Sequence, residues 1–103
     1  MKVDLEFEFN PEKNIQLKEE RGVSFEEVAY YINNGHLLDV IRHPNQHKYA
    51  GQHFYVVDID GYVYLVPFVQ QGNKIFLKTI FPSRKHTKFY QEKLHQHRRK
   101  KYE

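Results

Sequence analysis

The sequence predicts an α+β domain: an antiparallel sheet of four to five strands, packed with two N-terminal helices and a C-terminal helix. Three observations predict it. Residues 3–9 alternate between apolar and acidic side chains, two capped helical segments follow, and several strand-like segments then succeed one another from residue 36 to 81. Strands in one run, with helices at the ends, are typical of this class. The predicted order is β-α-α-β-β-β-β-α.

The N-terminal segment VDLEFEF predicts a half-buried strand, because its apolar side chains occupy every second position. Asn10 and Pro11 are the residue types preferred at the N-cap and first position of a helix. We expect that helix to continue to about Arg21, where Gly22 can adopt the left-handed conformation that ends it.

A second helix is predicted to begin at Ser24. Ser24 and Glu27 form a capping-box pattern, and Val23 and Val28 are spaced as a hydrophobic staple. Gly35 is expected to end this helix. The apolar residues of both helices predict packing against a sheet.

The strand segments are separated by turn residues. Asp60-Gly61 predicts a tight hairpin, and Pro67 predicts a strand edge or bulge near its position. Pro82 is expected to end the last strand, and a helix is expected from about Lys85 to Leu94. The predicted strands are HLLDVI (36–41), FYVVDID (54–60), YVYLVPFV (62–69) and IFLKTIF (75–81).

The chain has 103 residues and no cysteine. Its length predicts a single domain with one hydrophobic core. The missing cysteine excludes disulfides, a cysteine nucleophile and a thiolate zinc site. No segment is apolar enough for a signal peptide or a membrane span, so we expect a soluble, cytoplasmic protein that does not bind a membrane.

Charge is distributed unevenly along the chain. Residues 83–103 contain eight Lys and Arg against two acids, whereas residues 1–82 contain eight against eleven. A basic C-terminal end favours a polyanionic partner such as nucleic acid. We expect residues 1–94 to form the domain and residues 95–103 a basic tail that supplies accessory charge.

No familiar catalytic or cofactor motif is present, and no cofactor is expected. Four histidines (His36, His43, His47 and His53) flank one loop, and His95 and His97 lie near the end. A zinc site needs three or four ligands converging on one point, and this spacing does not predict one. We therefore expect no metal site.

Metal-independent RNA cleavage fits the composition better. Attack by the 2′-OH of RNA needs a base that works near pH 7, an acid for the leaving oxygen, and cations that hold the phosphate. Two basic clusters offer these groups. The first contains Arg42, His43, His47 and Lys48 with Tyr49; the second contains Lys78, Arg84, Lys85, His86 and Lys88 with Phe89 and Tyr90.

Structural roles compete for these residues. Lys78 either extends to the sheet edge or faces a cleft. Arg84 either binds phosphate near a helix start or pairs with an acid such as Glu12 or Glu19. His43 can be a hydrogen-bonded loop residue, and Tyr49 and Tyr90 can be packing residues instead of base-stacking platforms.

The order of motifs resembles the BrnT-like toxins of bacterial type II toxin–antitoxin pairs. The opening FEFNPEKNIQLKEERGVSFEEVAYYI is similar to the aromatic strand, Asn-Pro-x-Lys and SFEE-type helix of that family. KTIFPSRK followed by HTKFY resembles its strand, its Ser-Ala-Arg turn and its short helix. The resemblance spans about residues 5–90, as in a divergent member.

This resemblance implies the RelE/ParE-like superfold and an endoribonuclease that arrests translation, acting on RNA that is either free or on the ribosome. It also implies a ribbon-helix-helix antitoxin, with operator DNA bound only through the complex. Ser83 and Arg84 match the Ser-Ala-Arg turn, and Lys48 lies near a charged loop position. Where the family has Lys-His-Gly, this chain has Glu20-Arg21-Gly22, so that histidine's catalytic role does not transfer.

The resulting hypothesis assigns four catalytic residues. Arg84 and Lys78 bind the scissile phosphate, bracketing it from either side of Pro82, and His43 or His86 supplies acid–base catalysis. Contacts with RNA come from Lys48, Tyr49, Lys85, Lys88 and Tyr90. The alternatives are a non-catalytic module that binds nucleic acid or protein, and a gyrase-directed toxin on the same fold.

Overall fold

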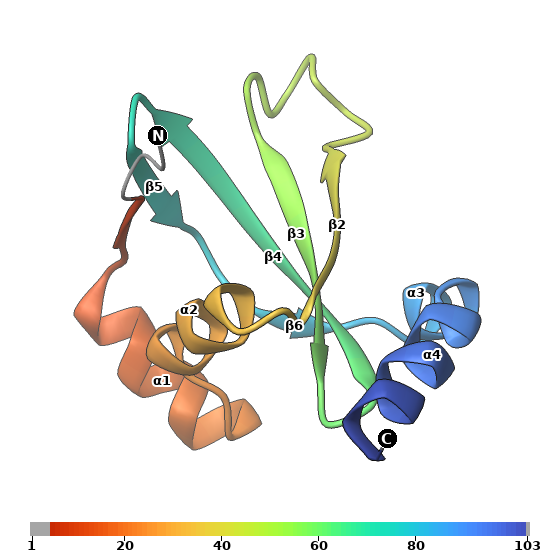
Figure 1. Ribbon diagram of the computed structural model, residues 1–103. Coiled ribbons are helices and arrows are strands. Elements are labelled where there is room, and N and C mark those ends of the chain that lie inside the picture. Colours follow the sequence, from red (N-terminus) through yellow and green to blue (C-terminus); the bar gives the residue numbers. More distant parts are fainter. Residues whose placement is uncertain (1–4, 103) are drawn as a thin grey trace.

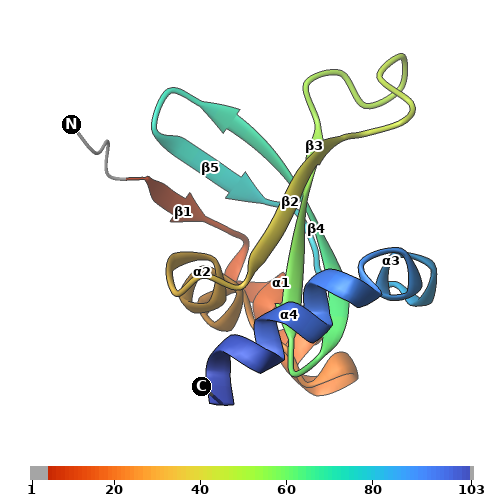
Figure 2. The same cartoon turned by 45° about the vertical axis from the view of Figure 1, so that its right-hand side comes forward.

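One twisted sheet organises the chain, and helices pack against both of its faces (Figures 1 and 2). The computed structural model describes residues 5–102. Within this part of the chain the sheet has six strands, in the order β1-β5-β4-β3-β2, with β6 beside β4. The predicted α+β class is confirmed, with one more strand than the predicted maximum.

The N-terminal elements follow the predicted caps. Strand β1 is Glu6–Glu8, helix α1 is Pro11–Arg21 and helix α2 is Phe25–Asn33. Asn10 accepts hydrogen bonds from two first-turn amides of α1, and Gly22 ends α1 at φ +67°. Ser24 accepts from the Glu27 amide at 3.1 Å, as the capping-box pattern predicts.

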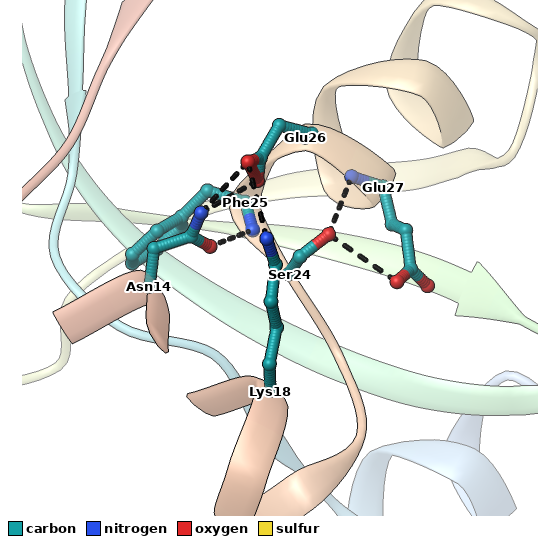
Figure 3. A network of polar contacts seen from close by, with 6 residues as sticks. All are labelled: Asn14, Lys18, Ser24, Phe25, Glu26 and Glu27. Atoms are coloured by element: carbon teal, nitrogen blue, oxygen red, sulfur yellow. Dashed lines mark hydrogen bonds and ion pairs between the residues drawn. The ribbon is translucent and has the colours of Figure 1, made fainter. Parts of the chain in front are cut away.

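The junction of α1 and α2 is a closed polar network around the buried Asn14 (Figure 3). Its Oδ1 accepts from the Phe25 amide at 2.8 Å, and its Nδ2 donates to the two carboxylate oxygens of Glu26 at 2.8 and 2.7 Å. The Lys18 ammonium lies 3.5 Å from the same carboxylate. Every polar atom of the Asn14 side chain is therefore satisfied, which fixes the angle between the helices.

The central strands form antiparallel ladders, with β3 paired to β2 on one side and to β4 on the other. Asp60 and Gly61, at φ +54° and +83°, form the predicted hairpin turn between β3 and β4. β1 pairs with β5 in parallel, which the prediction of an antiparallel sheet did not include. The bounds are β2 Leu37–Arg42, β3 His53–Ile59, β4 Tyr62–Gln71 and β5 Lys74–Leu77.

The predicted strand 75–81 is in fact two short strands, because β5 ends at Leu77 and β6 spans Phe81–Pro82. The break changes the alternation, so Leu77 and Ile80 enter the same core. Arg21 at the end of α1 donates from its guanidinium to the Ile80 carbonyl and satisfies backbone that has left the ladder.

Pro67 lies within β4, opposite Phe54 of β3. Its carbonyl accepts from the Lys78 amide at 2.8 Å, just where β5 has ended and β6 has not begun. The side of Pro67 that lacks an N–H therefore faces a gap in the sheet, where a proline is tolerated. The prediction of a strand edge or bulge at Pro67 is therefore wrong, because β4 is an interior strand whose pairing with β3 runs through Pro67 without a shift; the gap beside β5 takes that role.

The predicted single helix 85–94 is wrong, because the chain forms two helices that meet at Tyr90. Helix α3 is Arg84–Phe89, and helix α4 is Gln91–Tyr102. Tyr90 leaves the helical conformation at ψ +18° and turns its ring into the core. α4 continues across residue 94, where the basic tail was expected to begin.

Each face of the sheet carries its own core. On the first face, α1 and α2 contribute Leu17, Phe25 and Val28 to a large cluster with β3, β4 and β5. On the second face, α3 and α4 cover a smaller cluster of Val56, Val63, Leu65, Tyr90 and Leu94. No helix within the described residues is long and apolar enough to cross a membrane.

Candidate nucleic-acid interface

Ser83 anchors helix α3 to the sheet. Its backbone amide donates to the Val63 carbonyl at 2.9 Å, and its side-chain oxygen accepts from the His86 amide at 3.2 Å as the N-cap. Thr87 then bridges the helix and β4, donating to the Ser83 carbonyl at 2.7 Å and accepting from the Val63 amide at 2.9 Å. These bonds determine which side of α3 faces solvent.

The solvent-facing side of α3 is cationic and aromatic. We call Arg84, Lys85, Lys88 and Phe89 the α3 surface; all four side chains are exposed, and Phe89 is 79% exposed. No acidic residue lies in α3. Among the described residues Arg84 has no ion pair, so the predicted pairing with Glu12 or Glu19 does not occur.

His86 lies at the boundary between the α3 surface and the sheet. Its Nδ1 is 2.8 Å from the Ser83 hydroxyl oxygen, and the side chain is half-buried. Burial lowers the pKa of His86, and the positive charge of Lys85 lowers it further. The imidazole is therefore neutral near pH 7, the form that can accept a proton.

Tyr90 is 6% exposed and cannot offer its ring to a base. Its hydroxyl donates to the Asp39 carboxylate of β2 at 2.8 Å, while Lys93 donates to the Leu38 carbonyl at 3.3 Å. Burial and then this hydrogen bond raise the pKa of Tyr90 to about 12. The hydroxyl group of Tyr90 thus attaches the C-terminal helices to β2.

Beyond Tyr90, the second sheet face continues toward the 43–52 loop with no helix over it, and we call this part the open half-face (Figures 1 and 2). Alternation along the strands places six side chains on this open half-face, and all but Pro67 are at least partly exposed. They are Ile41, which also packs against the helix-covered cluster, and Phe54, Pro67, Val69, Phe76 and Lys78. Partly exposed aromatic residues on a sheet are typical of a surface that receives a ligand or partner.

Lys78 faces this surface and does not extend away from it. Its ammonium lies 5.2 Å from the centre of the Phe76 ring, and the side chain is exposed. A cation over an aromatic floor can contact phosphate while the ring contacts a base.

His43 begins the loop at one end of the open half-face, at the top of Figure 1. Its ring stacks near Tyr49 and Phe54, at centroid distances of 4.3 and 5.0 Å. Its Nδ1 accepts from the Asn45 amide at 3.0 Å, so the proton of the neutral ring is on Nε2. His43 is therefore a hydrogen-bond donor in this conformation and does not offer a free basic nitrogen.

The rest of the first basic cluster surrounds this ring. Lys48 lies 5.3 Å from the Tyr49 ring centre, and both side chains are exposed. Arg42 and His47 are exposed as well. Lys48 and Tyr49 are therefore both open to solvent, and their contact with RNA stays a prediction.

The backbones of Lys78 and of Ser83, the neighbour of Arg84, join β4 at different points. Lys78 pairs with Pro67 and Ser83 pairs with Val63 on the same side of β4, four residues apart along the strand. That separation is roughly 13 Å. The hypothesis that the two cations bracket one phosphate stays a prediction, with their attachment points on β4 four residues apart.

Sequence reasoning did not assign a role to Phe89, Phe54 or Phe76. Phe89 and Tyr90 are adjacent in the sequence, so only one of them can face the sheet. Helix α3 is rotated so that Thr87 and Tyr90 face inward, and Phe89 is therefore exposed. A prediction that the helix breaks at Tyr90 would have indicated which of the two aromatic residues is exposed. Phe54 and Phe76 were included in predicted strands, but no pattern marked their face as uncovered.

The described residues contain no group of three or more His, Asp or Glu side chains arranged to hold a metal ion. A comparison of the chain with protein-family models, with curated proteins and with solved structures found no match.

Proposed function

We propose that this chain is a toxin of a type II toxin–antitoxin pair that cleaves RNA in the cytoplasm without a metal ion. The observation that carries the proposal is His86. It is a neutral histidine beside a hydroxyl group, on a helix whose exposed side chains are cations and one aromatic ring. Helix α3 thus offers a proton acceptor for catalysis, cations for phosphate groups and an aromatic ring for a nucleobase.

In the proposed reaction, the Nε2 atom of His86 removes the proton from a ribose 2′-OH. The 2′ oxygen then attacks the adjacent phosphorus and the bond to the 5′ oxygen breaks. The products are a 2′,3′-cyclic phosphate and a 5′-OH end, with the leaving oxygen protonated by water. In this step the neutral ring carries its proton on Nδ1 and donates it to the Ser83 hydroxyl oxygen, which orients the ring and leaves Nε2 free to accept a proton. General base catalysis of this kind contributes about 10²- to 10⁴-fold in rate.

The other residues bind the strand. Arg84 contacts the scissile phosphate, Lys85 and Lys88 contact neighbouring phosphates, and Phe89 stacks on a base. Lys78 and Lys48 contact the strand where it crosses the open half-face. His43 donates from Nε2 to a phosphate or ribose oxygen.

The toxin role is supported by the resemblance to BrnT-like toxins and by the α+β fold class. By the same resemblance we propose a ribbon-helix-helix antitoxin as the partner, with operator DNA contacted through the complex. The unequal charge of the two ends of the chain also agrees with RNA and protein contacts on different surfaces.

The test is growth arrest in cells that express this protein without an antitoxin. We expect arrest with the natural chain, and relief of arrest with Arg84→Ala or His86→Ala at equal protein levels. Lys18→Ala removes one exposed cation from the opposite side of the molecule and is the matched control, which should remain toxic. Full toxicity of both α3 variants would refute the assignment.

A non-catalytic module that binds RNA is the second candidate. It is favoured by the separation of the two histidines, since His43 contacts Tyr49 and Phe54 while His86 contacts Ser83. Binding of RNA that weakens steeply with salt, without new RNA ends, would support this candidate.

A further inference from the structure

A pocket of about 320 Å³ lies between the tip of the 43–52 loop and the β4–β5 hairpin. Ala50 and Gly51 form one wall, and Val69 and Phe76 contribute apolar surface from adjacent strands. A small residue and a glycine leave space beside the aromatic ring, and nothing lies within 4 Å of the position that a Cβ on Gly51 would occupy. The site suits a planar ligand.

Two opposite charges complete the pocket. Glu8 of β1 is paired with Phe76 of β5 in the parallel ladder, and Lys74 is two residues before Phe76 on β5. Because Phe7 and Ile75 face the first core, the side chains of Glu8, Lys74 and Phe76 are all on the other face. Glu8 therefore lies beside Phe76 on the neighbouring strand and Lys74 lies two residues along the same strand, so the two charged residues flank adjacent sides of Phe76.

Neither charge is used elsewhere. Among the described residues, Glu8 and Lys74 form no ion pair. The Gln70 side chain donates to the Gly72 carbonyl at 2.9 Å, so one of its two amide protons is already committed. A ligand in the pocket thus meets a carboxylate that only accepts hydrogen bonds and an ammonium that only donates them.

We propose that this pocket binds the base of a guanine nucleotide and gives the RNA cleavage proposed above its nucleotide preference. Guanine has two adjacent donors, N1–H and N2–H, that match the two oxygens of Glu8. Its O6 atom is an acceptor beside them and matches Lys74, while the ring lies against Phe76. Adenine, cytosine and uracil each place an acceptor next to their donor, where it would face the carboxylate.

The position of the pocket connects it with the RNA surface. Phe76 also lies under the Lys78 ammonium, so the phosphate of a base held against Phe76 lies close to Lys78. From there the strand can run along β4 toward Phe81 and Arg84. We therefore expect cleavage a few nucleotides away from the bound guanine and not at it.

The inference rests on the proposed function only for its link to cleavage, because nucleotide binding can be measured separately. GMP, IMP, AMP, CMP and UMP are titrated into the ¹⁵N-labelled full chain while amide resonances are followed by NMR. GMP should shift the amides of Gly51 and Phe76. IMP, which lacks the N2 amino group, should bind about tenfold more weakly, as expected for the loss of one base-edge contact.

Glu8→Gln should remove the preference for GMP over IMP, since the amide replaces one of the two acceptor oxygens with an NH₂ donor, which would face a guanine donor. Glu12→Gln, at an exposed glutamate in the first turn of α1, is the matched control and should keep the preference. The spectra also report whether each variant is folded. Equal shifts with all five nucleotides, or none at Gly51 and Phe76, would overturn the inference.

Mapping the ends of cleaved RNA separates this inference from the proposed function. Cleavage without any guanine preference would refute the pocket assignment and leave the endoribonuclease proposal intact. Selective binding of GMP by a chain that never cleaves RNA would support the pocket assignment and refute the endoribonuclease proposal. A pocket that serves a protein partner instead would show no nucleotide-dependent shift and would count against the inference.

Discussion

The two faces of the sheet differ in how completely their side chains are used. On the face covered by α1 and α2, Asn14 has every polar atom bonded and Phe25 is fully buried. On the other face, helices cover only half of the sheet, and Lys78, Arg84 and Phe89 are exposed. The first face provides stability, and the second keeps unpaired cations and rings that can bind a ligand.

Two phenylalanines test this comparison with the same substitution. Phe25 has no exposed surface and stacks on Phe9 at 5.0 Å, whereas Phe89 is 79% exposed. Phe25→Ala should lower the free energy of unfolding by about 3–5 kcal/mol. Phe89→Ala should leave it within about 0.5 kcal/mol, measured by urea denaturation.

Phe89→Ala, which should hardly change stability, should reduce RNA affinity. Phe89→Ala should weaken binding of single-stranded RNA by about 1–3 kcal/mol, because a stacking ring is lost. A large loss of stability in Phe89→Ala would contradict the solvent exposure of Phe89, and unchanged RNA affinity would contradict its stacking on a base.

Asn14 is the polar centre of the closed face. Asn14→Ala removes one acceptor and one donor and leaves the buried Phe25 amide unpaired, so we expect a loss of about 1–3 kcal/mol in the free energy of unfolding. Gln16→Ala, which removes an exposed amide bonded to Glu20, is the matched control and should change little. Equal stability of the two variants would contradict a structural role for the network.

Tyr90 joins the C-terminal helices to β2 on the second face. Tyr90→Phe should lower the free energy of unfolding by about 1 kcal/mol, since the hydroxyl group that donates to Asp39 is lost. The folded state keeps the phenol neutral up to a pKa of about 12, whereas the unfolded chain ionises near 10. The natural chain should therefore lose stability as the pH rises from about 10 to 12. The free energy of unfolding of Tyr90→Phe should lack this contribution to the pH dependence.

The smallest expected effect is on the pH dependence of cleavage. His86 must be neutral to act as a base and its pKa is lowered, so the acid side of the pH–rate profile should lie below pH 6.5. Lys85→Met removes a positive charge that lowers this pKa, so the acid side should move to higher pH. Lys88→Met is the control, and a shift of equal size there would argue against His86 as the base.

Local signals in the sequence predicted the closed face well. Asn10, Ser24 and Gly22 act through neighbouring residues, and the structure confirms each cap. The Asp60-Gly61 turn is confirmed for the same reason. The network around Asn14 escaped prediction because its bonds join residues 11 and 12 positions apart.

The candidate interface was predicted in composition but not in arrangement. The basic cluster at 84–88 is local and lies on the surface as expected, yet the choice between Phe89 and Tyr90 depended on a helix break and on Asp39, 51 residues earlier. The gap between β5 and β6, which separates Lys78 from Arg84, depends on both Leu77 and Ile80 entering one core. Such effects arise from tertiary packing and have no local pattern.

The most direct test of the central claim is RNA cleavage by the purified chain in excess EDTA. We predict new RNA ends carrying a 2′,3′-cyclic phosphate, and a rate at least about 100-fold lower for His86→Ala at unchanged thermal stability. His95→Ala, at an exposed histidine of α4, is the matched control and should cleave at the natural rate. If the natural chain leaves RNA intact, or if His86→Ala cleaves as fast, the account of the α3 surface as a catalytic site is wrong.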